Sequence, residues 1–342
     1  MADMRTIPPA LTPVDIAGFH IRPYRGEEDL PALAELMDAS FVANGDTPGA
    51  NVDELSVELR NLPHIDPTRD LMLGFVGDRL VARSMVEWAD TADGASRYYQ
   101  TWGDVHPQWR RRGVGSRLWS SAIARLTAMA ESHDFGGSRY LTVPWMREGD
   151  AGGAVLAERF GYRQVRVYHH MTRPTLEDID VSPLPDGLEL RPIGQDDLPR
   201  VWSAVTEAFR DHFGAWDTGE HSYRRWVEDP SLDRSLLVVA FEGEDVAGGV
   251  HASIVPEENE ANGYLRGWTD PVYVRRPWRR RGLASALLAR ALVRLRDRGM
   301  TSAQLDVDTE NENQALTLYE RLGFETDRRA SEWHKPLEVD DA

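Results

Sequence analysis

The stretch "RRRGVGSRLW", residues 110–119, returns in altered form as "RRRGLASALL" at residues 279–288. In both copies a tryptophan stands directly before the first arginine, at Trp109 and Trp278. Three arginines followed by a glycine suit an anion, because glycine allows a ligand to approach the backbone closely. The repetition indicates that the chain builds the same local structure twice.

A strand is expected before each copy and a helix after it. The runs "YYQTWGDV", ending at Val105, and "YLRGWTDPVYV", ending at Val274, have the character of strands. After each glycine, the apolar residues follow the 3.6-residue spacing of an amphipathic helix. Each copy is therefore predicted to be a strand-loop-helix junction, where free N–H groups and the helix dipole favour a phosphate group.

The similarity extends over most of the chain, since "IRPYRGEEDLPAL" from residue 21 matches "LRPIGQDDLPRV" from residue 190. Near the ends, "LAERFGY" from residue 156 matches "LYERLGF" from residue 318. Internal repeats decide domain layout before any motif is weighed. We predict a duplication with one domain at 18–174 and a second at 187–337. The remaining segments are expected to be tails at 1–17 and 338–342 and a solvated linker at 175–186.

The composition narrows the class of protein. A length of 342 residues fits two domains, and 39 basic against 56 acidic residues give a net charge of −17, which argues against nucleic-acid or membrane partners. The absence of cysteine excludes disulfides, thiolate metal sites and cysteine nucleophiles. His169 and His170 have no further ligand at metal-binding spacing, so no metal is expected. With no leader and no long apolar run, we expect a cytoplasmic protein.

Other phosphate-binding motifs do not fit. The chain has no G-x-x-x-x-G-K-[ST] sequence and no G-x-G-x-x-G between a strand and a helix, which disfavours a nucleotide triphosphatase. Instead, Arg110-x-x-Gly113-x-Gly115 and Arg279-x-x-Gly282-x-Ala284 resemble the acyl-CoA pyrophosphate loop of the GNAT superfamily of N-acetyltransferases. The segment "NENQALTLYERLGF", 311–324, resembles the last helix and turn of that superfamily.

The resemblance is to tandem GNAT chains, which include the mycothiol synthase group. It implies an α/β fold of two tandem GNAT-like domains, each a bent mixed β-sheet flanked by helices, with acetyl-CoA between two splayed strands. It further implies a set of positions that hold acetyl-CoA as co-substrate. These are Val272, Val274, Arg279, Arg280, Arg281, Gly282, Leu283, Ala284, Ser285 and Asn311 in the second domain, and Arg110, Gly113 and Gly115 in the first.

The same resemblance assigns unequal chemistry to the two domains. Tyr319 stands where the superfamily commonly places the acid that protonates the departing CoA thiolate. The aligned residue in the first domain is Ala157, and the counterpart of Asn311 is about Gly149. The first domain is therefore expected to be catalytically degenerate and the second to be catalytic. Asn313 is an alternative to Asn311.

The general base is assigned to Asp270, which lies in the strand before the second arginine triplet. Its side chain is expected to point to the same face of the strand as those of Trp268 and Val272, so that its carboxylate could face the amine or hold a relay water. Thr101 occupies this position in the first domain. An ion pair of Asp270 with Arg266 or Arg275 is the structural alternative. His212, His221 and unaided deprotonation of the substrate are alternatives for the base.

The sequence thus predicts an acetyl-CoA-dependent N-acetyltransferase that modifies a primary amine, in a small molecule, at the C-terminal domain. A protein N-acetyltransferase and a non-catalytic acyl-CoA sensor are the alternatives. Nucleic-acid binding through the two arginine triplets is disfavoured by the overall charge. The motifs specify neither the acceptor nor an oligomeric state.

Overall fold

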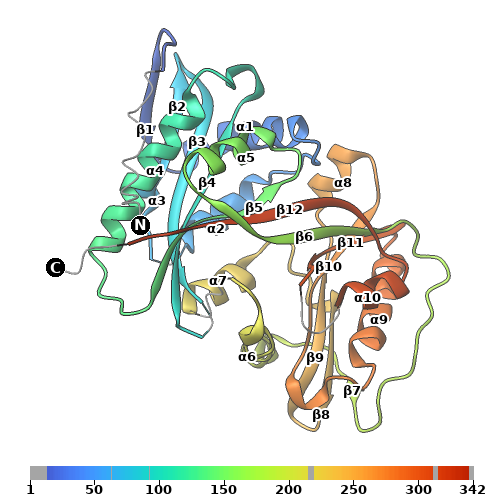
Figure 1. Ribbon diagram of the computed structural model, residues 1–342. Helices are drawn as coiled ribbons and strands as arrows, with labels where there is room; N and C mark the ends of the chain where they lie inside the picture. The colour runs from blue at the N-terminus through green and yellow to red at the C-terminus, as the bar shows by residue number, and fades with distance from the viewer. Residues whose placement is uncertain (1–13, 63, 92, 215–218, 311–314, 339–342) are drawn as a thin grey trace. The chain divides into compact units, whose positions relative to one another are not determined.

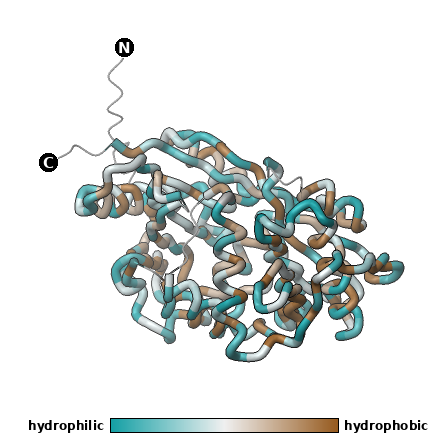
Figure 2. Tube along the Cα trace, turned by 90° about the horizontal axis from the view of Figure 1, so that it is seen from below, coloured by the Kyte–Doolittle hydropathy of each residue, from teal (hydrophilic) through white to brown (hydrophobic). Residues whose placement is uncertain are grey.

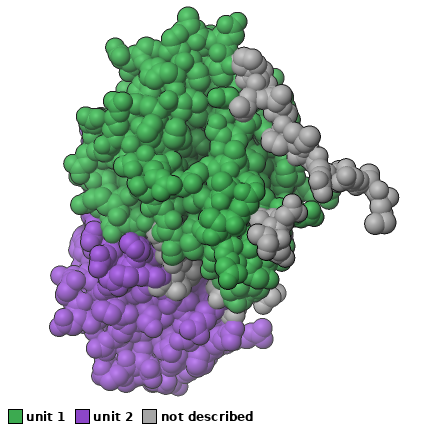
Figure 3. Space-filling view, turned by 90° about the vertical axis from the view of Figure 1, so that its left-hand side faces the viewer, with its two compact units in different colours: residues 1–165, 331–342 green, residues 166–330 purple. Residues whose placement is uncertain are grey.

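The computed structural model describes residues 14–62, 64–91, 93–214, 219–310 and 315–338. The chain forms two compact units (Figure 3): unit 1 comprises residues 1–165 and 331–342, and unit 2 comprises residues 166–330. Each unit is a mixed β-sheet flanked by helices (Figure 1), which confirms the predicted α/β class. The loops at the surface are largely hydrophilic (Figure 2).

Unit 1 has the strand order β1-β2-β3-β4-β5-β12, in which only β4 and β5 are parallel neighbours among the pairs with a described register. Its helices and strands, in chain order, are β1 (Phe19–Pro23), α1 (Leu30–Ala43), α2 (Val52–Arg60), α3 (Pro67–Asp70), β2 (Leu71–Val76), β3 (Arg79–Asp90), β4 (Ser96–Val105), α4 (Val114–Glu131), β5 (Ser138–Arg147) and α5 (Ala151–Arg159).

Unit 2 has the order β12-β6-β11-β10-β9-β8-β7, and its one parallel pair of described register is β10 with β11. Its elements are β6 (Arg163–Arg173), β7 (Glu189–Leu190), α6 (Leu198–Ala208), α7 (Glu220–Glu228), β8 (Leu237–Glu242), β9 (Asp245–Ser253), α8 (Pro256–Asn262), β10 (Arg266–Val274), α9 (Leu283–Asp297), β11 (Ser302–Asp308), α10 (Ala315–Arg321) and β12 (Glu325–Pro336). β6 and β12 each belong partly to unit 1.

Strand β8 shows how the sheet of unit 2 buries both faces. Val238 and Ala240 pack into the core beneath α9, whereas Leu237, Val239 and Phe241 pack into a second core beneath α6. Successive side chains of a strand point to opposite faces, so an unbroken apolar run is what a strand between two helical layers requires. Helices therefore cover both faces of this sheet.

The last strand of each repeat lies with the other unit. Strand β6, which follows α5 in the chain, pairs antiparallel with β11 from Tyr168 opposite Asp308 to Arg173 opposite Ala303. Strand β12 ends in unit 1, where the Leu337 N–H group donates to the Arg139 carbonyl at 2.9 Å. The compact units consequently differ from the predicted domains 18–174 and 187–337, because each repeat contributes its final strand to the sheet of the other.

The segment 175–186 packs on unit 2, although we expected a solvated linker. Leu176 is 1% exposed and belongs to the core beneath α9, against which Ile179 and Leu184 also pack. From α9 and the loop before it, Arg290 donates to the Ser182 carbonyl and Arg281 to the Asp186 carbonyl. The apolar residues hidden among the prolines and acids of this segment explain the difference. Among the described residues, none of the helices has the length and apolar character needed to cross a membrane.

The exchange of strands predicts that a residue late in the sequence stabilises unit 1. Trp333 is 7% exposed and packs in the core that contains Met146, Phe160 and Tyr162. We expect Trp333→Ala to lower the free energy of unfolding by about 3–5 kcal/mol, the usual cost of emptying a buried aromatic site. Urea unfolding would measure this change, and Val181→Ala, at an exposed position, is the control. Equal stability of the two variants would contradict the exchange.

Candidate active site

The two parallel strands at the centre of unit 2 diverge after a short stretch of pairing. β10 and β11 are in register only from Arg266–Trp268 to Ser302–Gln304, although they continue to Val274 and Asp308. At the point of divergence, the Thr269 hydroxyl donates to the Gln304 carbonyl at 3.2 Å. Beyond it, the described residues of β10 and β11 are not in register, so the edge of β10 that faces β11 carries peptide groups without a partner on that strand. This is the splayed opening that the family resemblance implies.

A β-bulge accompanies the divergence and corrects one expectation. Thr269 pairs with Ala252 of β9 and Val272 with Val250, so β10 holds one residue more than β9 over this stretch. An extra residue reverses the alternation of side chains. We predicted that the side chains of Val272 and Trp268 would point to the same face of the sheet. This was wrong, because Val272 lies on the other face and packs against the core beneath α9.

The arginine-glycine loops of the two units have nearly the same backbone. Gly282 has φ +82° and Gly113 has φ +84°, and each is the N-cap residue of its helix, α9 or α4, with no side-chain cap. Two residues earlier, Arg280 and Arg111 also have positive φ, at 60° and 61°. Residues of positive φ directly before the first turn of a helix leave its free N–H groups open to an anion.

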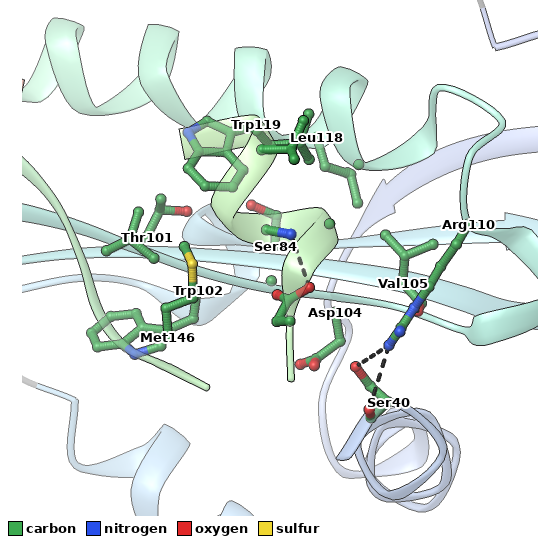
Figure 4. Close-up of a pocket in the computed structure, with 18 of the residues that line it drawn as sticks. Ser40, Ser84, Thr101, Trp102, Asp104, Val105, Arg110, Leu118, Trp119 and Met146 are labelled. Carbon is green, nitrogen blue, oxygen red and sulfur yellow. Dashed lines mark hydrogen bonds between the residues drawn. The ribbon is translucent and has the colours of Figure 1, made fainter. Parts of the chain in front are cut away.

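The first arginine of each triplet supports the loop from behind. Arg279 donates through Nε to the Val274 carbonyl at 3.0 Å and through Nη2 to the Ala208 carbonyl at 3.1 Å. In unit 1, Arg110 reaches the Ser40 hydroxyl at 3.1 Å (Figure 4). Both guanidinium groups therefore fasten the loop to the preceding strand or to a helix, and the ligand-binding part of these two residues is their backbone.

The other arginines differ in their surroundings. Arg281 donates to the Asp186 carbonyl and thereby holds the segment before β7. Arg280 and Arg111 are exposed at the positive-φ positions of the two loops. Of each triplet, the middle guanidinium is therefore the one best placed to meet a phosphate.

The remaining predicted cofactor residues fall at the same junction, with one exception. Val272 and Val274 turn their side chains into the core beneath α9, which leaves the backbone of this part of β10 to a ligand. Leu283, Ala284 and Ser285 form the first turn of α9, and Leu283 is buried. Asn311 and its alternative Asn313 lie outside the described residues.

The structure brings the predicted acid and base together. Tyr319, on α10, is 7% exposed and meets Phe324 edge to face at 6.1 Å. Burial raises the pKa of the Tyr319 hydroxyl, and the nearby charge of Asp270 raises it further. The phenol consequently keeps its proton at neutral pH and can act as a donor.

Asp270 lies in surroundings that suit a base working near neutrality. Asp270 is an exposed residue of β10, although the protein atoms around its carboxylate partly desolvate it. This desolvation, followed by repulsion from Asp306, raises the pKa of Asp270 to about 7. A base is most effective when its pKa lies close to the working pH. The alternative, an ion pair of Asp270 with Arg275, is not found among the described residues, since Arg275 pairs with Glu207 at 2.7 Å.

Asp306 and His170 belong to the site but were not identified from the sequence. His170 Nδ1 lies 2.9 Å from Asp306 Oδ1, and its other nitrogen lies 3.9 Å from Asp327. The imidazole packs edge to face on Trp268 at 5.5 Å. The alternation in "QLDVD", residues 304–308, could have indicated Asp306. His170 gave no such signal, because it reaches β11 only through the exchanged strand β6.

The alternative histidines have other contacts. His212 Nδ1 lies 2.7 Å from the Phe213 carbonyl, and its ring meets Phe209 at 5.2 Å. His221 is an exposed residue of α7. Neither is among the charges that raise the pKa of Tyr319, as Asp270 is.

Unit 1 repeats the opening without the acid and base. β4 and β5 are in register only as far as Gln100 and Thr142, and a cavity of about 720 Å³ lies in the opening beyond, lined by both strands and the Gly113 loop (Figure 4). The counterpart of Asp270, Thr101, is buried and donates to the Met85 carbonyl at 3.1 Å. The counterpart of Tyr319, Ala157, is fully buried.

Each unit has a sheet opened in the same way beside a backbone anion site, and in unit 2 the charge of Asp270 acts on the buried phenol of Tyr319. These features define a tandem acyltransferase. Comparisons with known proteins identify its family. Residues 201–324 match the model of the acetyltransferase (GNAT) family. The chain is 30% identical over 307 residues to mycothiol acetyltransferase of Salinispora arenicola, covering 86% of this chain and 91% of the relative. The protein of that name from Geodermatophilus obscurus is 31% identical, with coverage of 86% and 90%.

Solved structures agree. A GCN5-related N-acetyltransferase from Sphaerobacter thermophilus has a TM-score of 0.69 and 25% identity, covering 93% of this chain and 95% of that one. A tandem GNAT protein from the clavulanic acid biosynthesis pathway shares the fold, with a TM-score of 0.63, 18% identity and coverage of 94% and 100%. The chain belongs to the GNAT family of acetyltransferases. The predicted resemblance and enzyme class are thereby confirmed.

The repulsion between Asp270 and Asp306 predicts a shift in pH dependence. A base must be ionised, so kcat/KM is expected to rise with pH through about 7, the pKa of Asp270. Asp306→Asn removes the neighbouring charge and should move this rise to lower pH by on the order of half a unit. Steady-state kinetics from pH 5 to 9 would measure it, with Asp297→Asn, at an exposed position, as control. A profile that moves to higher pH would contradict the assignment.

Ionisation of Asp270 should also destabilise the folded state. Its pKa is raised in the folded state, so the fold favours the protonated form, and stability falls as pH rises from its ordinary value of 3.8 toward about 7. Asp270→Asn is therefore expected to raise the melting temperature at pH 8 more than at pH 4, while it lowers kcat by about 100-fold or more. Thermal melts at both pH values test the sign. A larger increase in melting temperature at pH 4 than at pH 8 would contradict this account.

Proposed function

We propose that unit 2 transfers an acetyl group from acetyl-CoA to the primary amine of a small molecule. The observation that carries this proposal is the proximity of Tyr319 and Asp270 at the opening between β10 and β11, beside the Gly282 loop. A proton donor, a proton acceptor and an anion site in one opening are what acyl transfer from a CoA thioester to an amine requires.

The two side chains divide the proton transfers. Asp270 accepts a proton from the ammonium form of the acceptor, directly or through a water, and leaves a nucleophilic amine. The amine nitrogen then forms a bond to the thioester carbonyl carbon, its second proton passes to water, and the carbon–sulfur bond breaks. Tyr319 gives its proton to the departing thiolate. The proton on Asp270 and the deprotonated phenol then restore the starting state through solvent.

The loop residues support acetyl-CoA as the donor. The N–H groups around Gly282 and the first turn of α9 would hold the pyrophosphate, with Arg280 over it. A Cβ at Gly282 would meet nothing within 4 Å, so the glycine serves the backbone conformation and the approach of a ligand, not packing of the protein. Peptide groups of β10 from Asp270 to Val274 would pair with the amides of the cofactor arm. Asn311 keeps its proposed role in contacting that arm.

Unit 1 is proposed to hold acetyl-CoA or CoA without transferring it. Its loop has the same backbone as the loop of unit 2, and its cavity of about 720 Å³ lies directly behind Gly113 and Gly115. Thr101 and Ala157 replace the base and the acid, which supports the assignment of catalysis to unit 2. The relatives named mycothiol acetyltransferase support a small-molecule acceptor over a protein, and a cytoplasmic location remains part of the proposal.

Removal of the Tyr319 hydroxyl tests the chemistry. With acetyl-CoA and a panel of primary amines, Tyr319→Phe is expected to reduce kcat by about 100-fold, because the thiolate loses its acid, while acetyl-CoA affinity stays nearly constant. Released CoA can be read with a thiol reagent, since the chain contains no cysteine. Unaltered kcat would remove the assigned role.

A matched pair of variants identifies the working unit. Ser285 and Ser116 occupy the third position of α9 and α4, directly after the two glycine loops. Ser285→Trp should block the pyrophosphate site of unit 2 and abolish amine-dependent CoA release. Ser116→Trp places the same side chain in unit 1 and should leave release intact. The reverse result would assign catalysis to unit 1.

A further inference from the structure

Unit 2 contains a second cavity on the face of the sheet covered by α6 and α7. Its volume is about 280 Å³, and it is lined by side chains of α6, α7, β8, β9 and β10. Pro271, which follows the proposed base Asp270 in β10, forms part of the wall. Trp202 and Trp226 line another part, with their rings roughly parallel and 5.6 Å apart. The cavity therefore reaches the residue that follows the proposed base, and it has an aromatic wall.

Tyr273 presents a hydroxyl group to this cavity. The residue is 4% exposed, and within the described part of the chain its hydroxyl has no hydrogen-bond partner. The hydroxyl lies above Gly249, where an added Cβ would come within 2.5 Å of it. Glycine at this position is what makes room for the phenol. A buried hydroxyl left without a partner costs free energy, so a group that satisfies it would bind favourably.

His251 presents a second unsatisfied group. The Trp226 indole N–H, which can only donate, lies 3.3 Å from His251 Nδ1, so Nδ1 is the acceptor. In the neutral imidazole the proton then resides on Nε2, and this buried N–H has no partner among the described residues. Burial lowers the pKa of His251 to about 4, which keeps the ring neutral at physiological pH.

The two unsatisfied groups lie on one face of the sheet. Gly249 and His251 are two residues apart on β9 and so point to the same side, and Gly249 is the register partner of Tyr273 on β10. Both can donate a hydrogen bond, which calls for an oxygen acceptor. Arg225 and Asp229 both line the cavity, so their charges offset one another, and the neutral imidazole adds no further charge. The chemistry that fits is an uncharged hydroxyl or carbonyl oxygen on an apolar body.

We propose that this cavity binds the uncharged, oxygen-bearing part of the amine acceptor, with Tyr273 and His251 donating to its oxygen and the two indoles covering its apolar body. The inference rests on the proposed function, since it supplies the acceptor specificity of that same site. Tyr273, His251 and Gly249 then set substrate preference without taking part in the proton transfers.

Two amines that differ by one hydroxyl test the proposal, namely trans-4-aminocyclohexanol and cyclohexylamine with acetyl-CoA. Wild-type protein should have the higher kcat/KM for the hydroxylated amine. Tyr273→Phe should lower that preference by about fivefold, which corresponds to the loss of one hydrogen bond. Gly249→Ala, which places a methyl group against the Tyr273 hydroxyl, should reduce the preference independently.

Tyr264→Phe is the matched control, because the Tyr264 hydroxyl bonds to Glu258 at 2.6 Å and does not line this cavity. It should leave the preference unchanged. Equal kcat/KM values for both amines in wild type and in Tyr273→Phe would mean that the cavity holds only water, and would overturn the inference while the acetyltransferase activity stands.

Failure of the proposed function gives a different result, the acetylation of neither these amines nor the wider panel. Binding then decides the inference separately, through quenching of the indole fluorescence of Trp202 and Trp226. Tighter binding of trans-4-aminocyclohexanol than of cyclohexylamine, lost in Tyr273→Phe, would support the cavity as an oxygen-recognising site. Equal binding of the two amines would overturn it.

Discussion

The parting of β10 from β11 is the constraint on which the site depends. A continuous sheet would pair every peptide group of these strands and leave no place for a ligand between them. One extra residue between Thr269 and Val272, set against β9, lets β10 turn away while it stays bonded on its other side. The same bulge places Asp270 where the strands diverge. Opening, backbone donors and base thus come from a single local irregularity.

Much of this arrangement could be predicted from local sequence. The glycine that must adopt positive φ, the apolar spacing of α9 and the position of Tyr319 are all determined by neighbours in the chain. No residue type in the sequence marks the bulge, so it was not predicted, and Val272 was assigned to the wrong face of the sheet. His170 and the strand exchange depend on pairings between distant segments, for which a single sequence provides no signal. Such pairings decide which acids surround Asp270.

The charges at the site oppose one another in a way that serves catalysis and not stability. Asp306 and the surrounding protein both disfavour an ionised Asp270, although an ionised Asp270 is what accepts a proton. A fully solvated aspartate would be ionised but weakly basic at neutral pH, because its ordinary pKa is 3.8. His170 lies beside Asp306, with its Nδ1 atom 2.9 Å from Asp306 Oδ1. The position of His170 on an exchanged strand makes this balance dependent on both repeats.

Divergence of the two units is clearest at one pair of facing positions. Unit 1 has Arg83 opposite Asp104, joined by an ion pair at 2.6 Å, and unit 2 has Gly249 opposite Tyr273. The ion pair gives each of these two charged groups an opposite charge, and both residues line the cavity of unit 1. Glycine and tyrosine together leave a hydroxyl without a partner, a loss for the free protein that only a bound molecule can recover. The equivalent positions of the two units therefore carry an ion pair in unit 1 and the proposed recognition surface in unit 2.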